Sequence, residues 1–131
     1  MAFVWSEATY HTNRASTVPL TINSEAQGAN LTIMVNAVLS KGIIEACKGT
    51  VYFRFGVDMV GHKVGFMAQG HGGTAWRKMR VDKHGRLVAC VRASIYGIHG
   101  DEIAGQYYDF RFDKNDQFWV ADIRTRQHKK R

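Results

Sequence analysis

The residues with the clearest chemical potential are the cations and aromatic rings between positions 76 and 92. Trp76 begins this segment, and a single acidic residue, Asp82, lies within it. Cationic side chains neutralise phosphates and aromatic rings stack on unpaired bases, so their mixture is typical of proteins that hold single-stranded nucleic acid. The segment is therefore the first candidate binding site, with six cations: Arg77, Lys78, Arg80, Lys83, Arg86 and Arg92.

The charge of the whole chain is distributed in blocks. The 131 residues carry a formal net charge of +7 with a pI of about 9.7, which points to an acidic partner. Residues 1–50 are balanced, residues 93–123 are acidic and residues 124–131 are basic again. Two separate basic blocks indicate local contacts rather than a general solubility charge. We expect nonspecific attraction to phosphate from the C-terminal cations Arg124, Arg126, Lys129, Lys130 and Arg131.

Catalytic and metal-binding patterns are weak by comparison. The six histidines form no HxH or HExxH pattern and have no close cysteine partner, so no metal site is predicted. Ser94 lacks the glycines of a nucleophile elbow, and no glycine cluster has the spacing of a phosphate-binding loop. The sequence therefore predicts a binding protein without enzymatic activity or cofactor. A small hydrolase that uses His71 and an acid from another loop is the enzymatic alternative.

The cysteines and the chain start suggest a reducing compartment. Cys47 and Cys90 form no CxxC motif, and the residues from Met1 to Glu7 lack the basic stretch and apolar core of a secretion signal. No apolar run approaches the roughly 18 residues of a membrane span. We expect two reduced, mostly buried thiols in a cytoplasmic protein that does not contact a membrane.

The first half of the chain is expected to form strands and one helix. Proline is tolerated at a sheet edge, so Pro19 places residues 18–22 in an edge strand. The apolar spacing of residues 31–46 predicts an amphipathic helix capped by Asn30. A strand over residues 31–39 is the alternative, but it would put Met34 and Val38 on the polar face. Period-two alternation then predicts strands over residues 51–59 and 64–68.

The second half is expected to form two hairpins. A three-residue turn at 83–85, with Gly85 in the left-handed conformation, pairs Val81 with Leu87 and Met79 with Ala89. This register also places Asp82 opposite Arg86, Lys78 opposite Cys90 and Trp76 opposite Arg92. By analogy, a turn at 114–116 pairs Phe112 with Phe118 and Phe110 with Val120.

These elements predict an α+β fold, with an antiparallel sheet of about five or more strands covered by one amphipathic helix. Residues 1–123 would form a single domain and residues 124–131 a disordered basic tail. The solvent face of the first hairpin is expected to carry the binding residues. The alternative is that Trp76 belongs to a second core layer. The predicted face comprises Trp76, Lys78, Arg80, Arg86, Arg92 and Tyr96, extended by Tyr52 and Arg54.

The basic and aromatic sheet face, the glycine-rich segment at residues 70–73 and the basic tail resemble small bacteriophage proteins that bind single-stranded DNA. The resemblance covers the character of residues 50–131 rather than a motif. Together with the residues, it favours single-stranded DNA over RNA, with little sequence preference, and homo-oligomers in the cytoplasm of a bacterial host. It also implies a role in viral transcription or replication. The alternative is a protein-interaction module whose basic face binds an acidic partner, such as an RNA polymerase or a host factor.

Overall fold

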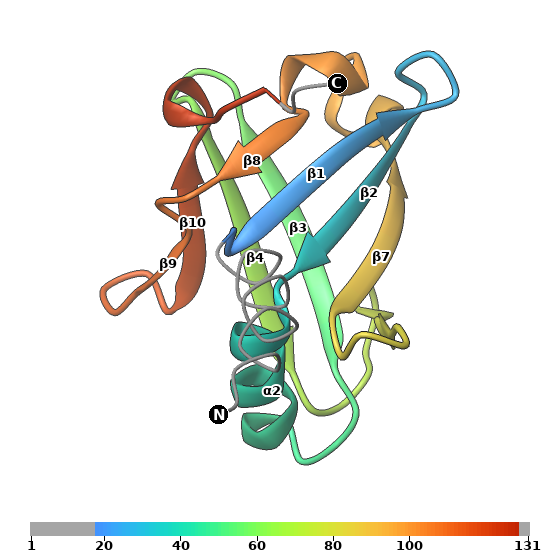
Figure 1. Ribbon diagram of the computed structural model, residues 1–131, viewed down its shortest axis with the longest axis vertical. Coiled ribbons are helices and arrows are strands. Elements are labelled where there is room, and N and C mark those ends of the chain that lie inside the picture. The colour runs from blue at the N-terminus through green and yellow to red at the C-terminus, as the bar shows by residue number, and fades with distance from the viewer. Residues whose placement is uncertain (1–17, 129–131) are drawn as a thin grey trace, which may run out of the picture.

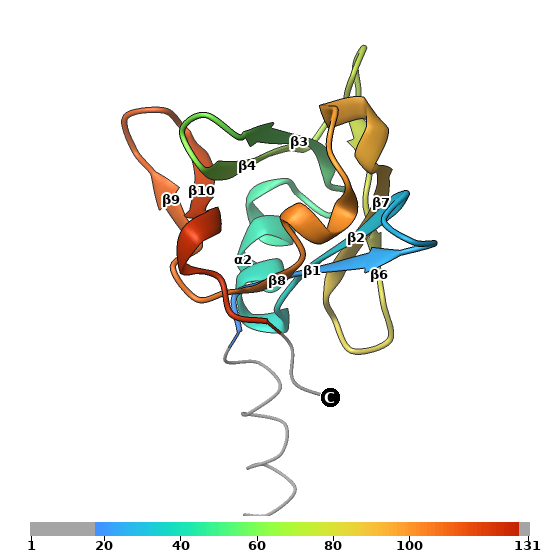
Figure 2. The same ribbon diagram turned by 90° about the horizontal axis from the view of Figure 1, so that it is seen from above.

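The computed structural model describes residues 18–128, and this part of the chain contains two antiparallel five-stranded sheets (Figure 1). Sheet A has the strand order β6-β7-β2-β1-β8, and sheet B has the order β5-β3-β4-β10-β9. The view from above shows the two sheets on opposite sides of a shared interior (Figure 2). The strands are β1 (Leu20–Glu25), β2 (Asn30–Val35), β3 (Tyr52–Asp58), β4 (Lys63–Gln69), β5 (Arg77–Lys78), β6 (Arg80–Val81), β7 (Leu87–Arg92), β8 (Gly105–Tyr107), β9 (Arg111–Asp113) and β10 (Phe118–Asp122).

Alternating apolar residues of both sheets fill the space between them, because successive side chains of a strand point to opposite faces. Phe53 and Phe66 of sheet B stack with their ring centroids 6.2 Å apart, and Phe110 packs on the edge of the same cluster. Sheet A contributes aliphatic side chains to this core. The largest fully buried apolar members are Leu20, Ile22, Leu31, Ile33, Val35, Val64, Phe66, Leu87, Ile103 and Tyr107.

The helix α2 (Ala37–Ala46) covers one end of the two sheets. Asn36 caps it by accepting a hydrogen bond from the Leu39 N–H at 2.8 Å. The buried Ser40 hydroxyl donates to the Val35 carbonyl and accepts from the Leu87 N–H, both at 2.9 Å. Short 3-10 helices lie at the opposite end (Figure 1): η1 (Ala93–Tyr96), η2 (Gly100–Glu102) and η3 (Ile123–Thr125).

The predicted α+β fold is confirmed. The prediction was one antiparallel sheet of about five or more strands with one helix, and the described residues contain two five-stranded antiparallel sheets and one α-helix. The strands predicted over residues 51–59 and 64–68 are β3 and β4. None of the helices in residues 18–128 is long and apolar enough to cross a membrane.

The predicted helix over residues 31–46 is wrong in its first third, where the chain forms β2. Leu31, Ile33 and Val35 are buried on one face of that strand, while Met34 is only partly covered on the other. The apolar run fits both periodicities, and pairing of β2 with β1 and β7 decides between them. The helix therefore begins after Asn36 rather than Asn30.

The predicted edge strand is a central strand. β1 lies between β2 and β8 in sheet A. Pro19 is compatible with this position because it precedes the first paired residue, Leu20, and so removes no hydrogen bond from the ladder. Its carbonyl accepts from the Asn36 N–H at 3.0 Å, next to the start of α2.

The first hairpin is correct at its turn and wrong beyond it. Val81 pairs with Leu87, and Gly85 has a φ of +80°. Upstream, the chain changes sheets at Met79, whose N–H donates to the Val51 carbonyl at 2.9 Å. Lys78 therefore pairs with Tyr52 of sheet B, not with Cys90 of sheet A. The predicted pairs of Met79 with Ala89 and of Trp76 with Arg92 are absent from the ladders.

The second hairpin has a longer turn than predicted. Asp113 pairs with Phe118, so four residues separate the strands and Phe112 pairs with Trp119 instead of Phe118. The Gln117 N–H donates to the Asp113 carbonyl at 2.8 Å, and Gln117 adopts a φ of +63°. The extra residue shifts the register by one position, which exchanges the two faces of the strand.

Two further expectations are corrected. The folded part continues past residue 123, because Gln127 exchanges both backbone hydrogen bonds with Gln106, at 2.7 and 2.9 Å. The cysteines are free thiols as predicted, but Cys90 is exposed on the outer face of sheet A and only Cys47 is partly covered. Burial raises the pKa of the Cys47 thiol.

Candidate nucleic-acid interface

The structure divides the predicted cationic face between the two sheets. Arg80 pairs with Val88 and Arg92 pairs with Asn30, so both arginines project from the outer face of sheet A. Lys78 pairs with Tyr52 and projects from the outer face of sheet B. The change of sheet at Met79 separates cations that a continuous strand would have placed on one face.

Of the two aromatic residues predicted to stack on bases, Tyr96 has side-chain contacts within the protein. The Tyr96 hydroxyl donates to the Phe55 carbonyl at 2.9 Å, and the ring packs edge-on against Phe55. Burial raises the pKa of Tyr96, although the nearby charge of Arg77 acts in the opposite direction. Trp76 is half-buried in a tight turn, where its N–H donates to the Gly73 carbonyl at 3.1 Å.

Several of the other predicted cations are engaged by the protein itself. Arg86 donates to the Asp82 carboxylate at 2.8 Å. Desolvation raises the pKa of Asp82, but the hydrogen bonds from Arg86 and from the His84 N–H, together with the Arg86 charge, lower this pKa overall. Arg124 pairs with Asp122 at 2.9 Å, and its hydrogen bonds lower the pKa of Asp122 to about 2.

Arg126 donates to the carbonyls of Ala104 and Ile123, at 2.9 and 2.8 Å. Arg77 and Lys83 are exposed. Lys129, Lys130 and Arg131 lie outside the described residues.

The outer face of sheet B brings together a different group of residues. Its side chains form rows across the strands, because paired residues point the same way. In the first row Lys78, Tyr52 and Gln69 are neighbours, and in the second Arg54 lies opposite Met67. The third row consists of Gly56, Gly65, Val120 and Arg111, and the fourth of Asp58, Lys63 and Asp122.

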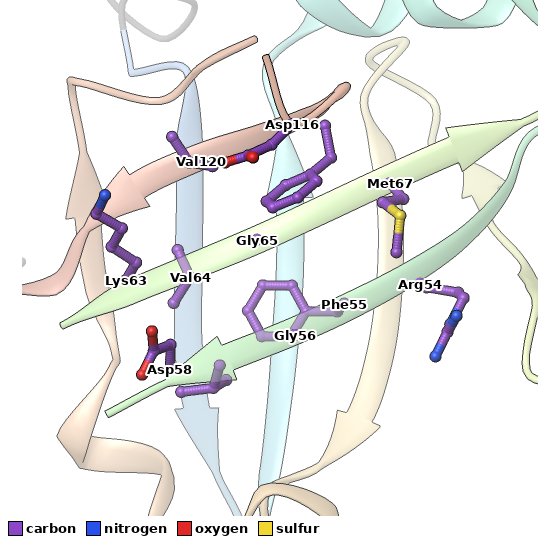
Figure 3. Close-up of a pocket in the computed structure, with 12 residues that line it drawn as sticks. Arg54, Phe55, Gly56, Asp58, Lys63, Val64, Gly65, Met67, Asp116 and Val120 are labelled. Atoms are coloured by element: carbon purple, nitrogen blue, oxygen red, sulfur yellow. The ribbon is translucent and has the colours of Figure 1, made fainter. Parts of the chain in front are cut away.

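The third row is a gap in this surface, since two adjacent strands carry glycines at the same level. We call it the glycine trough, a hollow of about 420 Å³ whose floor includes Gly56 and Gly65 (Figure 3). The ring of Phe118 lies beside the floor: a Cβ added to Gly65 would be 3.2 Å from its Cε1. Other residues that border the trough are Arg54, Asp58, Lys63, Met67, Asp116 and Val120.

The volume of the trough lies in the ordinary range of small-ligand sites. Its walls offer a ring edge, a thioether, two cations and two carboxylates. The side chains of Arg54 and Lys63 make no hydrogen bond or ion pair within residues 18–128, so both cations are free to bind an anion. Among these described residues, no three His, Cys, Asp or Glu side chains gather where they could hold a metal ion.

Sequence reasoning found Tyr52, Arg54 and Lys78 but missed the trough between them and β10. Gly56 and Gly65 occupy outward positions of two alternating strands, and that signal is readable in the sequence. The sequence does not show that these two glycines pair with each other. The position of Phe118 was also missed, because the hairpin that contains it was predicted in the wrong register.

Comparisons with protein-family models, with curated proteins and with solved structures gave no match.

Proposed function

We propose that the protein binds single-stranded nucleic acid, DNA in preference to RNA, on the outer face of sheet B. The observation that carries the proposal is the glycine trough, an open hollow bordered by Phe118 and flanked by the unpaired cations Arg54 and Lys63. A groove of this kind combines a surface for a flat base with charges for the neighbouring phosphates.

In this proposal an unpaired base enters the glycine trough and contacts the Phe118 ring and the Met67 thioether. Arg54 and Lys63 stand at opposite ends of the hollow, where phosphates on either side of the base would lie (Figure 3). Lys78 extends the cationic path along β5. Duplex nucleic acid would bind less tightly, because its base faces are hidden by stacking.

Filling the glycine trough tests the proposal. A Cβ added to Gly56 meets no atom within 4 Å, and the backbone there is ordinary strand, so Gly56→Val adds bulk without strain. We expect an unchanged or higher melting temperature, since valine suits a strand better than glycine does. Binding to a labelled oligothymidylate, followed by fluorescence anisotropy, should weaken by about 1–3 kcal/mol, the value of one base stack.

Gly42→Ala is the matched control. Gly42 lies in α2, and an added Cβ there also meets nothing within 4 Å. The control should leave affinity unchanged. If Gly56→Val folds and binds as tightly as the unmodified protein, the trough is not the contact surface. If the unmodified protein binds no single strand, the function itself is wrong.

A further inference from the structure

Asp116 differs from Asp58, the other carboxylate that borders the glycine trough, and from the carboxylates of β9 and β10. Asp58 accepts a hydrogen bond from the Gly61 N–H, Asp113 accepts from the N–H groups of Asn115 and Asp116, and Asp122 is paired with Arg124. The Asp116 carboxylate makes no hydrogen bond or ion pair within the described part of the chain, yet Asp116 borders the trough. It is an acceptor available to a ligand.

The position of Asp116 relative to the trough defines what it can contact. The residue lies in the turn between β9 and β10, and in the view of Figure 3 its carboxylate points toward Val120, which also borders the hollow. Phe118 follows it closely in the chain and borders the floor. A flat ring on the floor would therefore have an aromatic neighbour and would present one edge to the Asp116 carboxylate.

An ionised carboxylate only accepts hydrogen bonds, and it has two oxygens for two parallel donors. Guanine is the base whose Watson–Crick edge offers two adjacent donors, N1–H and the N2 amino group. Adenine and cytosine each place a ring nitrogen acceptor beside their amino group, and thymine flanks its one N–H with carbonyls. These acceptors would be repelled by the carboxylate.

We propose that the glycine trough prefers guanine, because the free carboxylate of Asp116 accepts hydrogen bonds from its N1–H and N2 amino groups. This inference rests on the proposed function and assigns a base to the same site. It replaces the sequence-based expectation of little sequence preference with a specific contact. Single-stranded bases are recognised at their Watson–Crick edges in this way when they are unstacked on a protein surface.

The test compares oligothymidylates in which every third thymidine is replaced by guanosine, adenosine, cytidine or inosine. Lithium buffers prevent four-stranded guanine structures. The guanine oligomer should bind at least about fivefold tighter than the others, the lower limit for a paired side chain–base contact. The inosine oligomer, which lacks the N2 amino group, should lose most of that preference.

Asp116→Asn should remove the preference for guanine, because the amide keeps only one acceptor. Glu45→Gln is the matched control for charge, since Glu45 is an exposed residue of α2 outside the trough. Both variants lose one negative charge and should bind every oligomer somewhat more tightly. Only Asp116→Asn should change the ratio between oligomers, and its melting temperature should match that of the control.

The outcomes separate the two proposals. Equal affinity for all five oligomers would overturn the guanine preference and leave single-strand binding in place. A guanine preference that survives in Asp116→Asn would overturn the role of Asp116. No binding to any oligomer would overturn both proposals.

Discussion

Arg54 and Arg92 provide a comparison between the two sheets at the scale of a single residue. Both are exposed strand residues without an ion-pair partner in the described chain, but Arg54 borders the glycine trough and Arg92 projects from sheet A. We expect Arg54→Gln to weaken single-strand binding and to lower the steepness of its salt dependence by about 0.7, the value of one phosphate contact.

Arg92→Gln removes the same charge on the other sheet and should have little effect on either quantity. The measurement is a titration of both variants at several salt concentrations. Equal losses in the two variants would mean that binding follows net charge rather than the face of sheet B.

Tyr96 gives the second prediction at this scale. Its hydroxyl donates to the Phe55 carbonyl. Phe55 lies beyond the two residues of β3 that pair with β5. Tyr96→Phe keeps the ring and removes this hydrogen bond, so the free energy of unfolding should fall by about 0.5–1.5 kcal/mol. Affinity for oligothymidylate should stay the same. Chemical denaturation and anisotropy together check this, and an affinity loss without a stability loss would restore Tyr96 as a binding residue.

These residues show where sequence reasoning reaches its limit. Tyr52, Arg54 and Lys78 were predicted to share a face, and they do, because strand alternation fixes which side each points to. Trp76 and Tyr96 were assigned to the same face by extending β6 and β7 past their real ends. Alternation predicts which face a side chain points to only within a continuous strand. No local sequence pattern indicates that the chain changes sheet at Met79.

At the scale of elements, the junction between β2 and α2 is held by one buried side chain. Ser40 is 0% exposed, and its hydroxyl connects the Val35 carbonyl of β2 to the Leu87 N–H of β7. Ser40→Ala leaves both backbone groups without this partner in a buried place. The expected loss in the free energy of unfolding is about 1–3 kcal/mol, measured by urea denaturation.

Asn36→Ala is a useful comparison, because it removes the helix cap at the same junction. Loss of an N-cap costs about 0.5–2 kcal/mol. If Ser40→Ala is no more destabilising than a typical exposed substitution, the hydroxyl does not connect the two strands in solution.

The same junction explains why the helix was placed too early. Leu31, Ile33 and Val35 satisfy the period of a strand, and Leu31, Met34, Val35 and Val38 satisfy that of a helix. A short apolar run does not distinguish the two. The decision depends on β1 and β7, which lie on either side of β2 and supply its hydrogen bonds, and β7 is more than fifty residues away in the sequence.

At the scale of the whole molecule, the attraction that the net charge of +7 exerts on any nucleic acid differs from the contacts made by the outer face of sheet B. General attraction acts on single and double strands alike, whereas contact with the glycine trough requires an exposed base. Within residues 18–128, three cations of the outer face of sheet B make no side-chain hydrogen bond or ion pair: Arg54, Lys63 and Lys78. The contacts of these three cations should therefore contribute about −2 to the log–log slope of single-strand affinity against salt, from roughly 0.7 per phosphate contact.

The division between attraction and contact is tested by removing Lys129, Lys130 and Arg131, which leaves the described fold and the trough intact. Single-strand and duplex affinities should both fall at low salt, since these cations can add only attraction to phosphate. The ratio of the two affinities should not change, because it is assigned to the base in the trough. The measurement is a paired titration of both DNA forms with the full and the shortened chain. A ratio that collapses on shortening would place the preference for single strands in the C-terminal cations instead of sheet B.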